Sequence, residues 1–406
     1  MTKLDLDFVR EFFPGLNRDY IFMDNAGGSQ IALPVVERMN DYLFQANVQH
    51  GASYEVSQEA TERVAEATSL MRQYVNAQHD DEIVLGPSTS MLIRILAMGL
   101  VDQWEEGDEV IITNTDHEAN VSPWTDLAEK GIVIKTWKFR PDTLDLHIED
   151  LAPMLTERTR IVAMTHSSNI LGTINPVREV ADMVHSKGIQ ICVDGVAYAP
   201  HRLPDVQTLD VDYYIFSFYK VFGPHYALMY GRKELLERMK GMNHYFIQST
   251  PYKFQPGNVN YEMAYSLVGL CDYLDALAGH HEIEEEGRKG WQKVFDLFTD
   301  HEAMIGQQLI HFLKKKEGVK IIGLDHAQPE TRVPTIAFSV EGKDSEKIVQ
   351  QVDPHNIGIR FGDFYAKKLV QDLGITSQKG VVRVSLVHYN TEEEVDALIQ
   401  VLDEIL

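Results

Sequence analysis

The chain has 406 residues, 44% of them hydrophobic, and its 61 acidic side chains outnumber 37 basic ones, which gives a formal net charge of -24. This composition argues against disorder and allows one large domain and one smaller domain, each with its own core. Strong negative charge disfavours binding to phosphate backbones, so we expect no nucleic acid partner.

The cysteine content and the hydropathy pattern argue against a disulfide-rich protein, a thiolate metal site and a membrane protein. The two cysteines, Cys192 and Cys271, are too few and too far apart for a disulfide framework or a thiolate metal site. We therefore expect no metal ion and a reducing, cytoplasmic location. No stretch approaches the roughly 18 consecutive apolar residues of a spanning helix, so we expect no leader and no membrane association.

Short apolar runs recur along the first part of the chain and alternate with segments of helical periodicity. Runs of this length predict strands that are buried on both faces of a mainly parallel, helix-covered sheet. The predicted fold class is therefore α/β, with a doubly wound sheet. The expected strands are residues 82–86, 109–114, 132–137, 160–166, 189–195, 213–218 and 226–231.

The character of the sequence changes after about residue 262. Long helices are predicted up to residue 316, and strand-like runs follow within a smaller α+β unit, with a hinge near residues 280–290. We expect three parts: an N-terminal segment that packs near the candidate site and the small domain, a large domain, and a small C-terminal domain. Their predicted bounds are residues 1–30, 31–285 and 286–406.

Polar residues follow five of the expected strands. Ligands of doubly wound sheets collect outside the carboxyl ends of the strands, so these five segments are expected to converge on one site. The segments are "GPSTS", "NTDHEAN", "THSSNILG", "DGVAYAPH" and "SFYK".

Two of these segments carry a charge directly after an apolar run. Burial lowers the pKa of a lysine, so Lys220 is a usable nucleophile toward an aldehyde, although a lysine that only reaches solvent past its aromatic neighbours is the alternative. Asp194 needs a buried cationic partner, such as a protonated pyridine nitrogen, or it caps the next helix.

Other polar residues complete the pattern of a cofactor site. His117 suits stacking on an aromatic ring, with a hydrogen-bonded structural role as the alternative. Ser88 and Thr89 precede a helix, where hydroxyl and N–H groups hold a phosphate, and Ser217 adds a hydroxyl. An acid for a ring nitrogen, hydroxyls for a phosphate and a lysine for an aldehyde together describe pyridoxal 5'-phosphate (PLP).

Seven motifs, in order and spacing, resemble the class V aminotransferase family of fold-type I PLP enzymes, and especially its cysteine desulfurase and selenocysteine lyase branch. The resemblance runs from about residue 20 to the C-terminus. It implies a homodimer with shared active sites that acts on an amino acid as a small-molecule substrate. The motifs are "YIFMDNAGGSQ", "ANVQHGASYEVSQEAT", "NTDHEANVSPW", "THSSNILGTINPV", "VDGVAYAPH", "SFYKVFGPHY" and "VRVSLVHYNTEEEVDAL".

The resemblance implies a role for individual residues. Lys220 and His117 would be catalytic, Asp194 would pair with the pyridine nitrogen, and Arg383 would bind the substrate α-carboxylate, its alternative being an ordinary surface salt bridge. The other implied cofactor-binding residues are Ser88, Thr89, Asn169, Ser217 and Tyr219, with Gly257 and Asn258 reaching the phosphate of the other subunit. The other implied substrate-binding residues are Asn25, Ala26, Gly27, Arg360 and Tyr365.

Three positions depart from the family pattern. In "RFGDFYAKK", Tyr365 stands where the desulfurase pattern R-x-G-x-x-C has its persulfide cysteine, and a phenol cannot accept sulfur as a thiolate does. Ala197 replaces the glutamine that donates to the cofactor's phenolate, and Tyr219 replaces a histidine. Cys192 and Cys271 are expected inside a strand and a helix, so we predict no persulfide chemistry.

The loop that carries Phe361, Phe364 and Tyr365 is aromatic. It either covers an apolar or aromatic substrate or packs under the small domain.

A PLP enzyme of this kind removes the Cα proton of an amino acid, and transamination, β-elimination or epimerisation follows. We favour β-elimination of the C–S lyase type, with an aminotransferase or epimerase as the alternative. A catalytically silent binding module is the hypothesis from another class, and the presence of Lys220, Asp194, His117 and Arg383 disfavours it.

Overall fold

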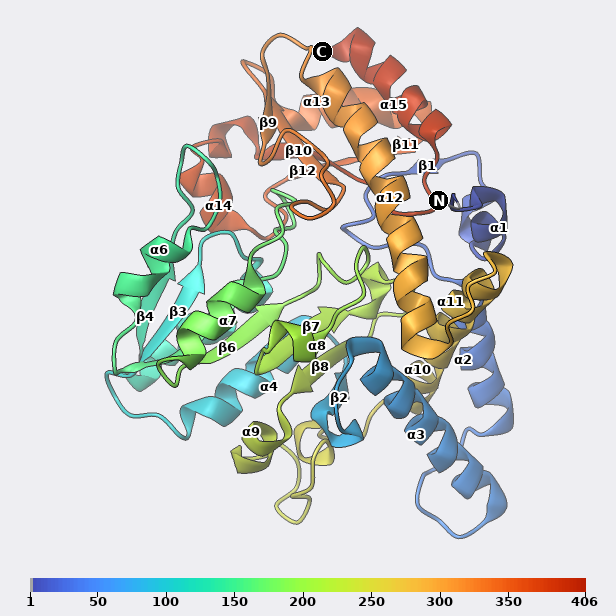
Figure 1. Ribbon diagram of the computed structural model, residues 1–406, viewed down its shortest axis with the longest axis vertical. Helices are drawn as coiled ribbons and strands as arrows, with labels where there is room; N and C mark the ends of the chain where they lie inside the picture. Colours follow the sequence, from blue (N-terminus) through green and yellow to red (C-terminus); the bar gives the residue numbers. More distant parts are fainter. Residues whose placement is uncertain (1–2) are drawn as a thin grey trace.

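The computed structural model describes residues 3–406, and a seven-stranded sheet with the strand order β2-β8-β7-β6-β5-β3-β4 forms the centre of its larger part (Figure 1). β8 is antiparallel to both of its neighbours, and the other pairings are parallel. The predicted α/β class and mainly parallel sheet are confirmed. The strands are β2 (Ile83–Gly86), β3 (Glu109–Thr113), β4 (Val133–Trp137), β5 (Thr159–Thr165), β6 (Gln190–Asp194), β7 (Tyr213–Ser217) and β8 (Ala227–Gly231).

Both faces of this sheet are buried along most of its strands because these are largely apolar, whereas the edge strand β4 is partly exposed. In β6, Ile191 and Val193 belong to one hydrophobic cluster, whereas Cys192 between them belongs to another. Successive side chains of a strand point to opposite faces, so the two clusters lie on opposite sides of the sheet. The helices of this part are α2 (Leu33–Gln45), α3 (Glu55–Val75), α4 (Thr89–Val101), α5 (Ser122–Thr125), α6 (Ile148–Leu151), α7 (Val177–His185), α8 (Val206–Leu209), α9 (Lys233–Arg238), α10 (Tyr261–Ser266) and α11 (Val268–His280).

A second, smaller unit contains an antiparallel four-stranded sheet with the order β12-β13-β10-β9. Figure 1 shows its elements, coloured orange to red, above the large sheet. The predicted small α+β unit is confirmed. Its elements are β9 (Val319–Ile322), β10 (Thr335–Val340), α13 (Ser345–Val352), β11 (Ile357–Gly358), β12 (Arg360–Gly362), α14 (Lys367–Asp372), β13 (Val381–Ser385) and α15 (Glu392–Ile405).

The long helix α12 (Gly287–Leu313) belongs to both units. Trp291 and Phe298 near its start pack in the core of the large part, and Ile305 and Leu309 pack in the core of the small one. Because one helix spans both cores, the domain bounds expected at residues 30/31 and 285/286 remain predictions.

The N-terminal segment joins the small sheet region. After α1 (Leu6–Glu11), β1 (Ile21–Phe22) pairs in parallel with β11, and the Ser385 N–H donates to the Met23 carbonyl. This arrangement places the following residues, from Asp24 onward, between the two units. Within residues 3–406, no helix is long and apolar enough to cross a membrane.

Candidate active site

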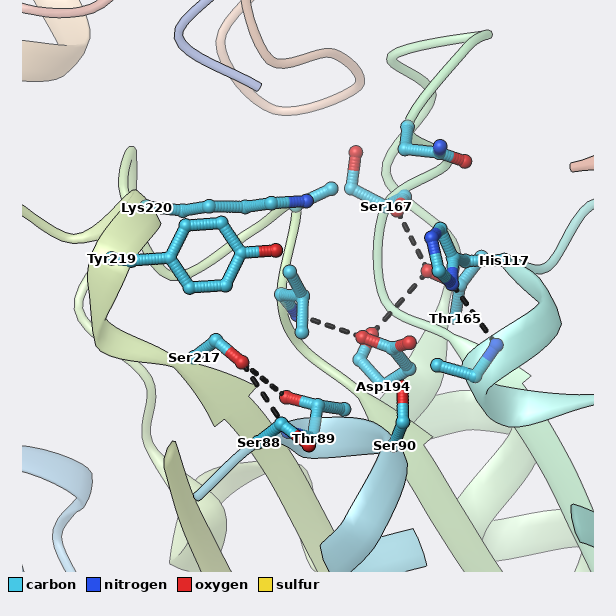
Figure 2. Close-up of a pocket in the computed structure, with 14 residues that line it drawn as sticks. Ser88, Thr89, Ser90, His117, Thr165, Ser167, Asp194, Ser217, Tyr219 and Lys220 are labelled. Carbon is cyan, nitrogen blue, oxygen red and sulfur yellow. Dashed lines mark hydrogen bonds between the residues drawn. The ribbon is translucent and has the colours of Figure 1, made fainter. Parts of the chain in front are cut away.

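The polar segments after the strands of the large sheet meet around one cavity of about 510 Å³. Figure 2 shows Lys220 and Tyr219 entering it from one side and His117 and Asp194 from the other, with Thr89 and Ser217 below them. The predicted convergence of strand ends is therefore present. The expected site residues that line this cavity are Ser88, Thr89, His117, Asn169, Asp194, Ser217, Tyr219 and Lys220.

Lys220 ends a short turn of 3-10 helix, Phe218–Lys220, that follows β7 directly. Its side chain is buried, and it forms no ion pair with any described residue. Burial, followed by the positive charge of Arg383, lowers the pKa of Lys220 to about 8. A substantial fraction of the amine is therefore neutral near pH 8, as a nucleophile requires.

Asp194 is the last residue of β6 and is also buried. Its Oδ1 accepts a hydrogen bond from the Val196 N–H at 2.9 Å, and burial raises the pKa of the carboxyl group to about 6. It forms no ion pair within residues 3–406. A buried carboxyl group with this partner set is suited to a cationic ring nitrogen.

His117 precedes a 3-10 turn, Glu118–Asn120, and caps it. The Ala119 N–H donates to His117 Nδ1 at 3.0 Å, so the proton of the neutral imidazole lies on Nε2. Burial lowers the pKa of His117 to about 4, and the charges of Lys220 and Arg383 act in the same direction. The ring is therefore neutral at physiological pH, which suits stacking on an aromatic ring and donating a hydrogen bond from Nε2.

Hydroxyl groups gather at the start of α4, where backbone N–H groups lack helical partners. Thr89 Oγ1 and Ser217 Oγ lie 2.7 Å apart, and both side chains are buried. Ser88 Oγ accepts the Met91 N–H at 3.2 Å, so it serves as the helix cap. Together with the helix N-terminus, these hydroxyls form a site of the kind that binds phosphate.

Arg383 in β13 is 2% exposed, so the surface salt bridge considered from the sequence does not describe it. Its Nη2 contacts Asp24 Oδ1 at 2.8 Å, its Nη1 donates to the Asn169 carbonyl at 3.2 Å, and its Nε has no partner. Burial lowers the pKa of Arg383. A buried guanidinium with an unused N–H group is able to receive a carboxylate.

Asn169 and Tyr219 occupy two other sides of the cavity. Asn169 Nδ2 donates to the Phe364 carbonyl at 2.9 Å, and its buried Oδ1 has no partner. Tyr219 stacks on His225 with ring centroids 4.7 Å apart. Lys220 Nζ lies 5.7 Å from the centroid of the Tyr219 ring.

Several expected substrate residues lie around an adjoining open cavity of about 1170 Å³, which Tyr219 also lines. Asn25, Gly27 and Arg360 line this cavity. The Asn25 side chain is fully engaged, because it donates to the Ser385 carbonyl at 2.9 Å among other partners. The Ala26 N–H donates to Ser385 Oγ at 2.8 Å.

The loop between β12 and α14 places Tyr365 beside His117, with ring centroids 5.3 Å apart, and the Tyr365 side chain is 63% exposed. Cys192 lies in β6 and Cys271 in α11, as expected. Both thiols are buried, and burial raises the pKa of each well above its usual value.

Gly257 and Asn258 lie away from the Lys220 cavity, beside the exposed side chains of Met91 and Met98. Their expected contact with a second subunit therefore stays a prediction.

Four residues of the site were not found from the sequence. Ser90, Thr165 and Ser167 also line the Lys220 cavity, and Asp24 holds Arg383. Thr165 ends β5 and Ser167 follows it within a motif that was recognised, so their position at the end of a strand was the available signal. Asp24 precedes Asn25 in another motif, but nothing in the sequence pairs it with a residue 359 positions away.

No group of three or more His, Cys, Asp or Glu side chains is placed to hold a metal ion in the part of the chain that the structure describes. The donor set fits PLP instead. The unpaired Asp194 carboxyl group, the unpaired Lys220 amine, the half-buried His117 ring and the hydroxyls at the start of α4 match its ring nitrogen, aldehyde, ring face and phosphate.

Comparison with known proteins gives the class of protein. Residues 21–398 match the family Aminotransferase class-V, and the chain belongs to this family. The family is PLP-dependent. The match of this chain to the family and to the relatives described below indicates that the chain is a PLP-dependent enzyme.

Among individual relatives, the chain is 40% identical to the aminotransferase-like protein FGM3 of Gibberella zeae, over 100% of this chain and 99% of that protein. It is 33% identical to the cysteine desulfurase-like protein ustD of Aspergillus flavus, over 99% and 91% of the two chains. Among solved structures, the cysteine desulfurase of Thermococcus onnurineus NA1 matches with a TM-score of 0.87 at 25% identity, over 100% of this chain and 98% of that one. The fold is that of fold-type I PLP enzymes.

Proposed function

We propose that the chain binds PLP in the Lys220 cavity and uses it to break bonds at Cα and Cβ of an amino acid. One observation carries this proposal. Lys220 and Asp194 are buried, have opposite charges and no ion-pair partner, and line the same cavity as the Thr89 and Ser217 hydroxyls. When bound, PLP stabilises the negative charge that develops at Cα.

Individual residues of the cavity would bind the cofactor and transfer the proton. Asp194 would hold the ring nitrogen, Thr89 and Ser217 the phosphate, and the neutral His117 ring would cover one face. Lys220 Nζ would bind the aldehyde and, once released, accept the Cα proton, for which its lowered pKa is suited.

Arg383 would bind the α-carboxylate of the amino acid. Its Nε is unpartnered, and its Nη2 is held by Asp24, which fixes the guanidinium between the two structural units. Arg360 lies 3.7 Å from the second oxygen of Asp24 and is more than half exposed, so it would stand at the substrate entrance.

β-Elimination is the reaction that we favour. In this reaction the Cα–H and Cβ–S bonds of an S-substituted L-cysteine break, and water converts the remaining fragment to pyruvate and ammonia while the thiol leaves. Relatives of the chain are described as cysteine desulfurases, whose chemistry also breaks a C–S bond. Elimination needs no enzyme thiol, and the Cys192 and Cys271 thiols are buried with raised pKa values.

An aminotransferase is the second candidate, because the 40% identical relative is described as aminotransferase-like. In that reaction the amino group stays on the enzyme and a keto acid later receives it, so no β-substituent is lost.

We further propose a homodimer in which the surface around Gly257 and Asn258 meets a second copy. The exposed Met91 and Met98 side chains beside these residues support an apolar contact there. The cytoplasmic location expected from the cysteine content stays a prediction.

The deciding experiment is product analysis with PLP-loaded protein. Pyruvate and ammonia from S-methyl-L-cysteine, without a keto acid present, support elimination. Conversion of L-alanine only in the presence of a keto acid supports the aminotransferase, and alanine with bound persulfide from free L-cysteine contradicts the absence of persulfide chemistry. A protein that takes up no PLP contradicts the whole proposal.

A further inference from the structure

We propose that Phe364 is a positioning residue for the α-carboxylate site, because its ring fixes the orientation of the Arg383 guanidinium. This inference rests on the proposed role of Arg383 in substrate binding. The guanidinium carbon of Arg383 lies 3.7 Å from the centroid of the Phe364 ring, and both side chains are buried. A guanidinium this close to a ring face is attracted by it and loses freedom to rotate.

The backbone of Phe364 adopts a conformation that is unfavourable for a residue with a bulky side chain. Phe364 has φ 50° and Tyr365 has φ 60°, so two consecutive residues with side chains adopt the left-handed region. Bulky residues rarely adopt this region, and such conformations persist where surrounding contacts hold them, often at functional sites. An extended Phe364 would direct its ring elsewhere than over Arg383.

The contacts that hold this conformation come from the large sheet's side of the molecule. Asn169 Nδ2 donates to the Phe364 carbonyl at 2.9 Å, and the Glu118 N–H donates to the Tyr365 carbonyl at 2.8 Å. The Asp363 side chain accepts the Tyr365 N–H at 2.9 Å within the loop itself. The loop between β12 and α14 is thus fastened to Asn169, which lines the cofactor cavity, and to Glu118, which follows His117.

Arg383 needs such support because its polar contacts leave one group free. Asp24 and the Asn169 carbonyl engage its two Nη atoms, while Nε has no partner. Two-point binding of a carboxylate depends on the orientation of the guanidinium plane, which the Phe364 ring restrains. Arg360 also faces this ring, but its guanidinium carbon lies 6.0 Å from the centroid and its side chain is more than half exposed, so the closer and more buried contact is the one with Arg383.

The test compares two reagents that react with the aldehyde of the bound cofactor, aminooxyacetate and methoxyamine. They differ in the carboxylate, so the ratio of their second-order rate constants, followed by absorbance, measures the carboxylate site without turnover. We expect the ratio to fall about threefold to tenfold in F364L, because one cation–π contact is lost. F364Y, which keeps the ring, should retain the ratio.

F361L is the matched control. Phe361 lies in β12, just before the loop that carries Phe364, but it packs against the core of the small unit. It should leave the ratio unchanged. Partial unfolding would slow both reagents alike, so the ratio separates a local effect from a loss of structure.

The outcomes also separate this inference from the proposed function. An unchanged ratio in F364L, or an equal fall in F361L, overturns the role of Phe364 while the proposed function stands. A wild-type ratio near one overturns the role of Arg383, and with it this inference. A chain that takes up no PLP overturns both.

Discussion

Thr89 Oγ1 and Ser217 Oγ lie 2.7 Å apart, although 128 residues separate them in the sequence. Thr89 begins α4 and Ser217 ends β7, and the sheet order brings the two elements together. The pair forms the floor of the cavity at a helix N-terminus, where a phosphate is stabilised by N–H groups and hydroxyls.

We predict that Thr89→Val lowers the affinity for PLP about tenfold to a hundredfold, because one hydrogen bond to a charged phosphate is lost. The affinity for pyridoxal, which has no phosphate, should change little. Equilibrium titration of the apoprotein with both compounds measures the difference, and Thr89→Ser serves as the control that keeps the hydroxyl. Equal losses for the two compounds would show that Thr89 acts on the fold and not on the phosphate.

Asp194, the proposed partner of the cofactor's ring nitrogen, should destabilise the apoprotein. Its folded pKa is about 6 against an ordinary value of 3.8, so the folded protein binds this proton more tightly than the unfolded chain does. The cost is therefore fully present above pH 6 and disappears as the pH falls toward 4.

We accordingly predict that Asp194→Asn raises the free energy of unfolding of the apoprotein by on the order of 1–3 kcal/mol at pH 8, and that PLP binding is lost. Urea unfolding of both proteins at pH 8 and pH 4 gives the difference at each pH. A variant that is less stable than the wild type at pH 8 would disprove this account.

The pKa of Lys220 leads us to predict how the rate of PLP binding to the apoprotein depends on pH. Because its folded pKa is about 8, the neutral amine that attacks the aldehyde increases as the pH rises through 8. The rate of PLP incorporation into apoprotein should rise through this range and level off about one pH unit above it. Stopped-flow absorbance measures this rate, and Lys220→Ala should yield no adduct that borohydride can fix. A flat profile between pH 7 and 9 would contradict the assigned pKa.

The two buried thiols predict resistance to alkylation. Cys192 and Cys271 are inaccessible and have raised pKa values, so iodoacetamide should label neither in the folded holoenzyme and should leave product formation intact. Mass spectrometry before and after unfolding counts the labelled thiols. Inactivation that parallels labelling of the folded protein would restore a thiol mechanism.

The sequence predicts features that depend on neighbouring residues better than contacts between residues that are far apart in the sequence. The seven strands of the large sheet follow from local runs of apolar residues, and the placement of Lys220 and Asp194 follows from their position at strand ends, where ligands collect. The departure at Tyr365 is also local, since it needs only the motif around it.

Pairings between distant residues were not predictable in this way. Asp24 contacts Arg383 across 359 positions, and the ring of Phe364, whose backbone is left-handed, covers the same guanidinium. The alternative that the aromatic loop packs under the small domain applies to Phe364, which is buried, whereas Tyr365 is exposed beside His117. Backbone conformation at these two bulky residues leaves no mark in the sequence.

The span between Asp24 and Arg383 has a consequence for biosynthesis. Every residue that lines the Lys220 cavity lies between residues 88 and 220, so the whole lining has been synthesised before the C-terminal strands exist. The proposed carboxylate site includes the ion pair between Asp24 and Arg383, which forms only after nearly the whole chain has been made. During synthesis, the lining of the proposed cofactor cavity is therefore complete before the proposed carboxylate site is.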